Sequence, residues 1–179
     1  MHIPDPAPAA TLPVIGADRA LAVRRILCVG QNYADHAREM GGDGRQPPFF
    51  FAKPADAIVP GGGVIPYPPR TADFHHEVEL VVAIGRGGSD IAAGDARDHI
   101  LGLAVGIDLT RRDLQAGAKK AGRPWDMSKG FDRSAPCAPL TLLTPDRALD
   151  RGGIALRVNG VERQRADLGD MTWSVAEIV

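Results

Sequence analysis

The sequence lacks most of the features that would assign it to a specialised class of protein. It contains only two cysteines, Cys28 and Cys137, which are too few for a disulfide framework and favour a reducing compartment such as the cytoplasm. No apolar run is long enough to cross a bilayer, and the N-terminus has no apolar segment of the kind found in secretory signals. We therefore expect a cytoplasmic protein with no membrane partner.

An excess of charge of one sign is also missing. The formal net charge of the 179 residues is -1, so no basic field attracts nucleic acid, and we expect no nucleic-acid partner. Aromatic residues make up only 5% of the chain, so aliphatic side chains must fill most of the core. Glycine and proline are abundant, with 21 and 15 residues, which favours a β-rich fold with many tight turns.

Residues 74–85 (FHHEVELVVAIG) form the most informative stretch. Its second half is apolar and β-branched and is too short for a typical helix, which predicts a buried strand. Glu77 and Glu79 are two residues apart at the start of this strand, so their side chains point to the same face. A hard divalent cation such as Mg²⁺, Mn²⁺ or Ca²⁺ would relieve the repulsion between them. The alternative is a solvated face on which the glutamates pair with Arg70 or Arg86.

A third acidic residue lies near the end of another predicted strand. Residues 101–109 (LGLAVGIDL) are apolar except for Asp108, and a carboxylate in that position is costly unless it has a partner. We interpret Asp108 as a third oxygen ligand for the same cation. The alternative is that Asp108 caps the helix that follows, although Thr110 is better placed for that role.

A helix is predicted from residue 110 to about residue 120, because a glycine and a proline follow it. Arg112 and Gln115 are three residues apart and share one helix face. The arginine there could hold a substrate carboxylate, and the glutamine could donate an amide hydrogen bond. The alternative is a solvated helix face. Residues 127–132 are predicted to form a loop that places Lys129 between small residues.

A strand at residues 23–29 is followed by a short predicted helix with Asn32 as its cap and Gly41 at its end. His36 and Glu39 are neighbours on that helix. A carboxylate beside an imidazole fixes the imidazole's tautomer and raises its basicity. Because glycines follow, the helix could move as a lid. The alternative is a surface ion pair.

The remaining segments set the domain organisation. Residues 49–53 predict a strand that stops at a proline, and Asn159-Gly160 between two short strands predicts a type I′ hairpin. We interpret residues 1–22 as an N-terminal extended arm or short edge strands, and residues 23–179 as one catalytic domain.

The C-terminal residues 172–179 (TWSVAEIV) predict a helix that has only begun. Ser174 and Glu177 have the spacing of a capping box. A domain seldom stops in the first turns of an amphipathic helix, so we expect the domain to be truncated at its C-terminus and to continue past Val179.

These segments together resemble the fumarylacetoacetate hydrolase family, most closely its acylpyruvate and fumarylpyruvate hydrolase branch. The matching motifs occur in the family's order from about residue 23 to the end of the chain. Together they are specific for the family and less so for its substrate. The motifs are Cys28–His36, Phe51–Pro54, His75–Leu80, Gly106–Gln115, Gly122–Trp125, Lys129–Asp132 and Val158–Gly160.

The resemblance implies an α+β, β-rich fold in which a mixed β-sheet rolls into a distorted barrel, with short helices and a lid helix. It also implies a homodimer. The family's metal triad corresponds to Glu77, Glu79 and Asp108, which would bind Mg²⁺ or Mn²⁺, with Ca²⁺ as a further candidate.

The resemblance also implies roles for other residues. The catalytic residues carried over from the family are His36, Glu39 and Lys129. The substrate contacts carried over are Arg112, Gln115 and Gln31, although the family often has arginine where this chain has Gln31. The family's Gly-Thr-Pro substrate loop falls beyond the last residue of this sequence.

The activity implied by the resemblance is metal-dependent hydrolysis of a carbon–carbon bond in a 2,4-diketo acid, with fumarylpyruvate, cleaved to fumarate and pyruvate, as the best example. In that scheme His36, held by Glu39, takes a proton from water, and Lys129 stabilises the oxyanion. Two alternatives stay open. The same site could decarboxylate oxaloacetate, or isomerise or decarboxylate a hydroxymuconate-type acid. The chain could also be a family member without catalytic activity.

Overall fold

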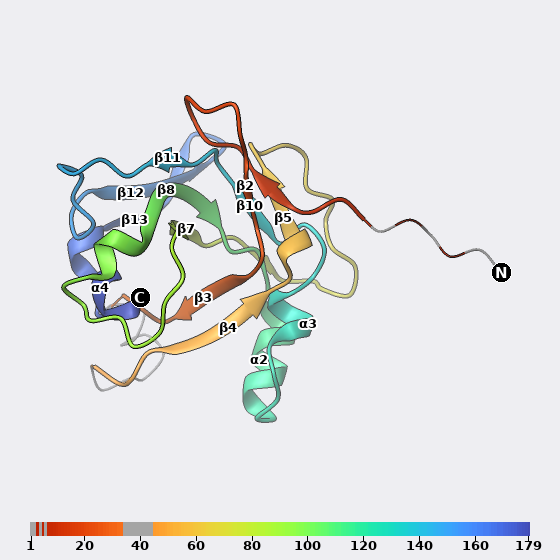
Figure 1. Ribbon diagram of the computed structural model, residues 1–179. Coiled ribbons are helices and arrows are strands. Elements are labelled where there is room, and N and C mark those ends of the chain that lie inside the picture. The colour runs from red at the N-terminus through yellow and green to blue at the C-terminus, as the bar shows by residue number, and fades with distance from the viewer. Residues whose placement is uncertain (1–2, 4, 6, 34–44) are drawn as a thin grey trace.

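The computed structural model of the chain describes residues 3, 5, 7–33 and 45–179 (Figure 1). The predicted lid helix with His36 and Glu39 lies outside the described residues. The strands are β1 (Thr11–Leu12), β2 (Leu21–Ala22), β3 (Ile26–Gly30), β4 (Phe49–Lys53), β5 (Ile58–Pro60), β6 (Phe74–His75), β7 (Val78–Ile84), β8 (Ile100–Ile107), β9 (Thr110–Arg111), β10 (Ala135–Cys137), β11 (Thr141–Leu142), β12 (Gly153–Val158) and β13 (Val161–Asp167). The helices are α2 (Arg112–Lys120), α3 (Asp126–Lys129) and α4 (Val175–Ile178), with short 3-10 helices at Ala55–Ala57, Ala96–His99 and Leu168–Asp170.

Strand β8 is the centre of the largest sheet. It pairs antiparallel with β7 along most of its length, and with β10 and β11 at separate points, while β5 joins β10 in parallel. The β7 and β8 segments are rich in β-branched and aliphatic residues, which suit a half-buried pleated surface. The strands predicted within residues 74–85 and 101–109 are therefore confirmed.

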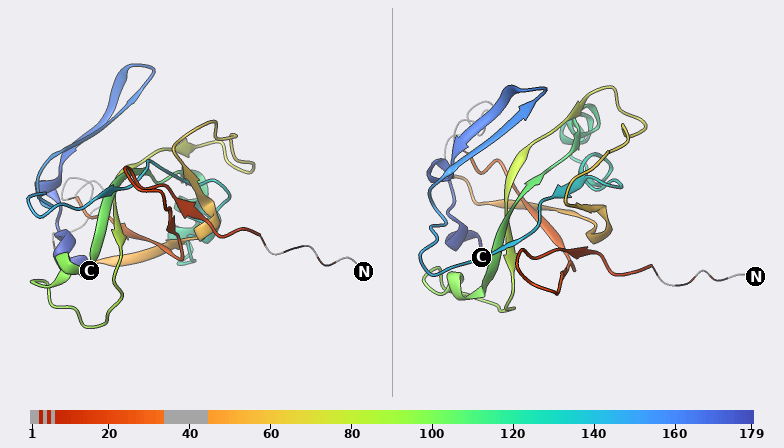
Figure 2. Two further views of the ribbon diagram at one scale, coloured as in Figure 1. Left: turned by 45° about the horizontal axis from the view of Figure 1, so that its top comes forward. Right: turned by 90° about the horizontal axis from the view of Figure 1, so that it is seen from above.

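The β-rich α+β class is confirmed as well. Among the described residues, one five-stranded sheet and four two-stranded sheets share the strands, and these sheets do not close into a barrel. The β12–β13 hairpin reaches away from the other strands (Figure 2). Its turn residues Asn159 and Gly160 have φ values of 51° and 80°, which confirms the predicted type I′ turn.

Aliphatic side chains form the core, as the scarcity of aromatics suggested. Within the described part of the chain there are two clusters of buried residues, one of Leu12, Ala83, Ala104, Cys137 and Leu140, the other of Ile100, Leu103 and Val175. Leu12 lies in β1, so the N-terminal segment contributes to the core through its short β1–β2 pair. Val175 lies in α4, which begins with the predicted capping box of Ser174 and Glu177.

Three local expectations differ from the structure. Thr110 does not cap the helix: it lies in β9, and α2 begins at Arg112. The segment predicted as a loop at residues 127–132 includes part of α3, where the Trp125 carbonyl accepts hydrogen bonds from the backbone N–H groups of Ser128 and Lys129, both at 2.9 Å. The strand predicted at residues 23–29 begins later, at Ile26.

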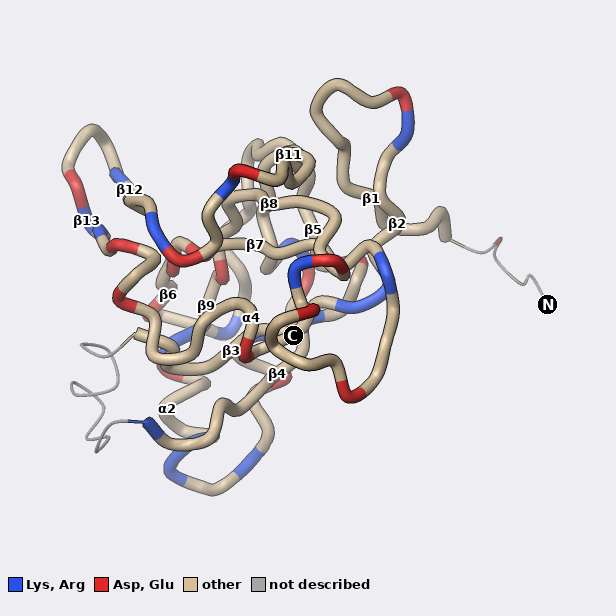
Figure 3. The backbone as a smooth tube through the Cα atoms, turned by 60° about the vertical axis from the view of Figure 1, so that its left-hand side comes forward, with Lys and Arg blue, Asp and Glu red and all other residues tan. Residues whose placement is uncertain are grey.

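Charged residues are interspersed along the chain and do not gather on one element (Figure 3). Within the part of the chain that the structure describes, no helix has the length and apolar character needed to cross a membrane.

The first prediction concerns the core. Leu140 is fully buried and packs with Leu12, whereas Leu142, two residues on, is 45% exposed. We expect Leu140→Ala to lower the free energy of unfolding by about 2–5 kcal/mol, because it removes buried methyl groups and leaves a cavity. Leu142→Ala should change it by less than about 0.5 kcal/mol. Urea unfolding followed by circular dichroism measures both, and equal effects would contradict this description of the core.

Candidate active site

Antiparallel pairing of β7 with β8 brings the three predicted acidic residues together. Glu77 directly precedes β7, Glu79 is its second residue, and Asp108 directly follows β8. The backbone N–H of Asp108 donates to the Glu77 carbonyl at 2.8 Å, and Glu79 pairs with Gly106 across the strands. The start of β7 therefore lies beside the end of β8, which places all three carboxylates at the same end of this strand pair.

Lys129 reaches this cluster from α3. Its Nζ lies 2.6 Å from Oε2 of Glu77, 2.6 Å from Oδ2 of Asp108 and 2.7 Å from Oγ1 of Thr110. Only 3% of the residue is exposed. The sequence predicted Lys129 as a site residue, and the structure places its ammonium group between two of the predicted metal ligands.

Arg112 and Gln115 also reach the cluster, from the first turn of α2. The Arg112 guanidinium donates hydrogen bonds to both Glu77 and Gln115. Gln115 is buried and the Arg112 side chain is 26% exposed, so this helix face is not a purely solvated one. The partners of Glu77 are thus Arg112 and Lys129, and not the Arg70 or Arg86 of the alternative interpretation.

The surroundings drive the pKa values of the two glutamates in opposite directions. Burial alone would raise the pKa of Glu77, but the charges and hydrogen bonds of Lys129 and Arg112 outweigh it and hold the pKa at about 2. Desolvation, and then the negative charges of Asp108 and Glu77, raise the pKa of Glu79 to about 8. The Glu79 residue is nevertheless exposed, so water screens part of the repulsion from its acidic neighbours.

Asp108 is a buried carboxylate with a cation on each side. Burial raises its pKa above the usual value, while Lys53 and Lys129 act in the opposite direction. Lys53 Nζ lies 2.8 Å from Oδ1 of Asp108, as an ion pair and not an aligned hydrogen bond, and Lys129 Nζ donates to Oδ2. Each oxygen of this carboxylate therefore faces a different ammonium group.

Lys53 is the site residue that the sequence reasoning missed. It ends β4, a strand that is otherwise aromatic and aliphatic, and is 3% exposed. The argument that identified Asp108, a charged residue closing an apolar strand, applies equally to Lys53. The two residues that this argument selects are partners of each other.

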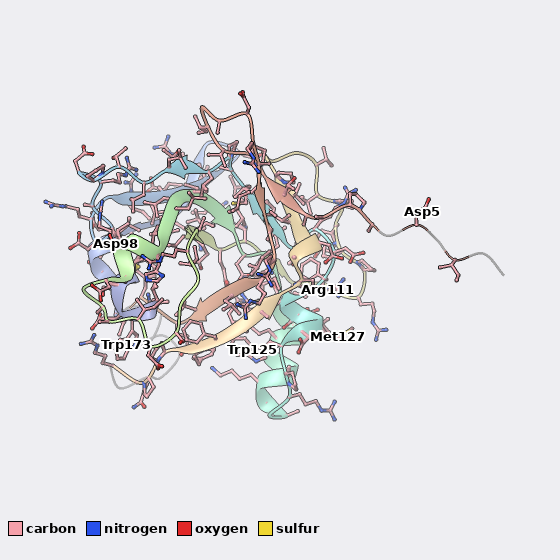
Figure 4. All side chains as sticks on the ribbon, viewed as in Figure 1. Asp5, Asp98, Arg111, Trp125, Met127 and Trp173 are labelled. Atoms are coloured by element: carbon pink, nitrogen blue, oxygen red, sulfur yellow. The ribbon has the colours of Figure 1, made fainter. Side chains whose placement is uncertain are left out.

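Aromatic rings cover the cationic groups. Lys129 Nζ lies 5.0 Å from the centre of the Phe51 ring, and the Arg111 guanidinium lies 4.4 Å from that of Phe131. In Figure 4 the labelled Arg111, Trp125 and Met127 lie near α3. These contacts stabilise cations in a place that water reaches poorly.

Asn32 and Gln46, which lie on either side of the undescribed segment 34–44, both form hydrogen bonds with Trp173. The Asn32 side chain donates to the Trp173 carbonyl at 2.9 Å and accepts from its N–H at 2.8 Å, and the Trp173 indole donates to the Gln46 carbonyl at 3.0 Å. Figure 4 shows Trp173 beside α4. Gln31 has a left-handed backbone with φ of 56°, and no described interaction joins it to the carboxylates. The roles of His36, Glu39 and Gln31 stay predictions.

The donor set fits a hard divalent cation. Three carboxylates lie at one end of the β7–β8 pair, and no described residue donates a hydrogen bond or an ion-pairing cation to Glu79, whose pKa is raised by desolvation and then by its acidic neighbours. Within the described ranges, no three acidic, histidine or cysteine residues surround a common point, and Lys129 lies between Glu77 and Asp108. Oxygen-only ligands with an unmatched negative charge favour Mg²⁺, Mn²⁺ or Ca²⁺ over softer metals.

Comparisons with known proteins agree with this picture. The family model "Fumarylacetoacetate (FAA) hydrolase C-terminal" matches residues 25–179. A crystal structure of fumarylpyruvate hydrolase from Pseudomonas aeruginosa, in complex with Mn²⁺ and pyruvate, is 49% identical with a TM-score of 0.92, and the match covers 99% of this chain and 78% of that one.

Two relatives from sequence comparison carry different names. Fumarylpyruvate hydrolase from Ralstonia sp is 39% identical over 131 residues, which are 73% of this chain and 68% of the relative. A mitochondrial oxaloacetate decarboxylase from Dictyostelium discoideum is 36% identical over 159 residues, covering 87% of this chain and 71% of the relative. The likeness thus extends to hydrolases and decarboxylases.

The second prediction concerns Glu79 in the absence of metal. Its pKa is raised from 4.5 to about 8, so the folded state keeps this proton at pH values where the unfolded state has released it. The contribution of Glu79 to stability is therefore complete below the unfolded pKa and is lost as the pH rises through the folded pKa.

We expect the melting temperature in EDTA to fall between about pH 5 and about pH 9. The fall should be smaller in Glu79→Gln and unchanged in Glu162→Gln, a control at an exposed ion pair with Arg165. Differential scanning fluorimetry gives the measurement, and the same slope in Glu79→Gln as in the unmutated chain would contradict the assignment.

Proposed function

Because this chain belongs to the fumarylacetoacetate hydrolase family, we propose that it is a metal-dependent hydrolase of a carbon–carbon bond in a 2,4-diketo acid. The best candidate substrate is fumarylpyruvate, which would give fumarate and pyruvate. The observation that carries the proposal is the carboxylate cluster with Lys129 at the β7–β8 edge. Its likeness to a fumarylpyruvate hydrolase solved with Mn²⁺ and pyruvate supports the choice of substrate.

Glu77, Glu79 and Asp108 would hold the divalent cation, with Mn²⁺ or Mg²⁺ as the candidates. Such an ion, when bound, supplies a Lewis acid for the keto and carboxylate oxygens of a 2-keto acid. Arg112 would bind a substrate carboxylate, and the Gln115 amide beside it would add a hydrogen bond.

Lys129 would stabilise the oxyanion that forms when water adds to the distal carbonyl. An ammonium group has three N–H donors, and Lys129 already directs them at Glu77, Asp108 and Thr110. Stabilising an oxyanion therefore requires one of these bonds to be exchanged. The bond to the neutral Thr110 hydroxyl is the weakest of the three and is the one most readily given up.

His36 would take the proton from the attacking water, with Glu39 holding its ring in the right tautomer. Both residues lie in the undescribed segment 34–44, and the described residues Asn32 and Gln46 on either side of it hydrogen-bond to Trp173. We also propose that the chain acts as a homodimer in the cytoplasm, as the family resemblance implies. Size-exclusion chromatography with light scattering measures the oligomeric state.

The third prediction tests the substrate and the metal site together. With Mn²⁺ or Mg²⁺, the protein should remove the diketo-enol absorbance of fumarylpyruvate, and Glu77→Gln should lower kcat/KM by about 100-fold or more, because it removes a ligand of the Lewis acid. Lys120→Met, on the exposed last turn of α2, serves as the control. Full activity in Glu77→Gln would reject the metal role, and no turnover by the unmutated chain would favour the non-catalytic alternative.

Oxaloacetate decarboxylation is the second candidate activity, and the Dictyostelium discoideum relative supports it. Decarboxylation needs no attacking water, so a water-activating base matters only for hydrolysis. The fourth prediction is that His36→Ala lowers kcat for diketo-acid cleavage by about 10²–10⁴-fold and spares any decarboxylation of oxaloacetate. Equal losses in the two assays would contradict the role of His36 as the base for water.

A further inference from the structure

Lys53 contacts two residues of the proposed site and the backbone between them. Its Nζ lies 2.8 Å from Oδ1 of Asp108, donates to the Leu109 carbonyl at 3.1 Å, and donates to the Lys129 carbonyl. One ammonium group thus joins the end of β4, the turn between β8 and β9, and the last residue of α3. Its side chain is 1% exposed.

The burial of the Lys53 ammonium carries a free-energy cost that its contacts must offset. A buried ammonium group is costly unless its charge and its donors are matched, and Lys53 meets two carbonyl acceptors and one carboxylate at the site. Burial lowers the pKa of Lys53, and the carboxylate of Asp108 acts against that shift. The Phe131 ring, 5.6 Å from Nζ, covers another side of the group.

We propose that Lys53 is a positioning residue for the site. It holds Oδ1 of Asp108, so that Oδ2 faces Glu77 and Lys129, and it fixes the Lys129 carbonyl at the end of α3. The orientation of the Asp108 carboxylate and the direction of the Lys129 side chain therefore both depend on the buried Lys53 ammonium. The catalytic part of this inference rests on the proposed function, while the orientation of Asp108 does not require any particular substrate.

Two effects of removing Lys53 oppose each other, and their balance tests the proposal. A positive charge close to a cation site repels the cation, so deleting a merely neighbouring charge would tighten metal binding. Deleting a group that orients a ligand weakens binding, typically by about 10–100-fold for outer-shell partners. The proposal requires the second effect to win.

The fifth prediction is that Lys53→Met, which keeps the length of the side chain and removes its charge, binds Mn²⁺ about 10–100-fold more weakly than the unmutated chain. Electron paramagnetic resonance of free Mn²⁺ at neutral pH measures this without any substrate. Unchanged or tighter binding overturns the inference. If the unmutated chain itself binds no Mn²⁺, the proposed metal site fails, and this inference fails with it.

A double-mutant cycle tests whether Lys53 acts through Lys129. We expect kcat for fumarylpyruvate to fall in Lys53→Met with little change in KM. The double variant Lys53→Met/Lys129→Met should have a kcat no lower than that of Lys129→Met alone. Independent, multiplying losses would overturn the positioning role, even if the Mn²⁺ result holds.

Two further variants separate positioning from a general loss of structure. Ser134 Oγ donates to the same Lys129 carbonyl at 2.9 Å but does not contact Asp108. Ser134→Ala should therefore keep its Mn²⁺ affinity within about threefold, and a loss equal to that of Lys53→Met would overturn the inference. If Lys53→Met does not fold, Lys53→Gln serves instead, because it removes the charge and keeps a neutral donor at this position. It should show the same weakened Mn²⁺ binding, and undiminished binding would overturn the positioning role of Lys53.

Discussion

The pairing of Asp108 with two buried ammonium groups is the interaction on which the site depends. A carboxylate that is 7% exposed is tolerated only when cations and donors replace its lost water. Lys53 and Lys129 supply them from two different elements, one strand and one short helix. Because both lysines pair with this carboxylate, the interaction ties β4, the end of β8 and α3 together. The same requirement that makes the cluster costly to bury therefore fixes the geometry of the candidate active site.

The backbone does the rest of the positioning through ordinary antiparallel pairing. The β7–β8 register sets Glu79 opposite Gly106 and leaves Glu77 beside Asp108. A side chain at Gly106 would run into Val81, since an added Cβ would lie 2.7 Å from one of its methyl groups. The strand that carries the acids can therefore lie close to its neighbour, and the acidic edge follows from the register without any special loop.

Because the acidic cluster follows from strand pairing, part of it could be predicted from the sequence. Glu77, Glu79 and Asp108 were identified because strand periodicity and a charge at a strand end are local signals, and Arg112 and Gln115 because helix spacing is local too. Lys53 carried the same signal as Asp108 and was overlooked, since a partner from a strand about 55 residues away can only be matched by folding the chain. The short helix α3 was missed for a related reason: four residues give too little periodicity to separate a helix from a loop. The roles of His36 and Glu39 came from family resemblance, and they fall outside the described residues.

The charge balance of the cluster explains why Lys129 is central to it. Glu77 and Asp108 are matched by Lys53, Lys129 and Arg112, whereas Glu79 has no cation in contact among the described residues and feels the repulsion of both neighbours. Two of the three donors of Lys129 meet carboxylates, and the third meets the neutral Thr110 hydroxyl. The bonds of Lys129 to Glu77 and Asp108 hold this balance, whereas its bond to the neutral Thr110 hydroxyl does not, so that donor is the one free to turn to a developing negative charge. The end of the β7–β8 pair that gathers the acids thus also holds a buried cationic donor beside them.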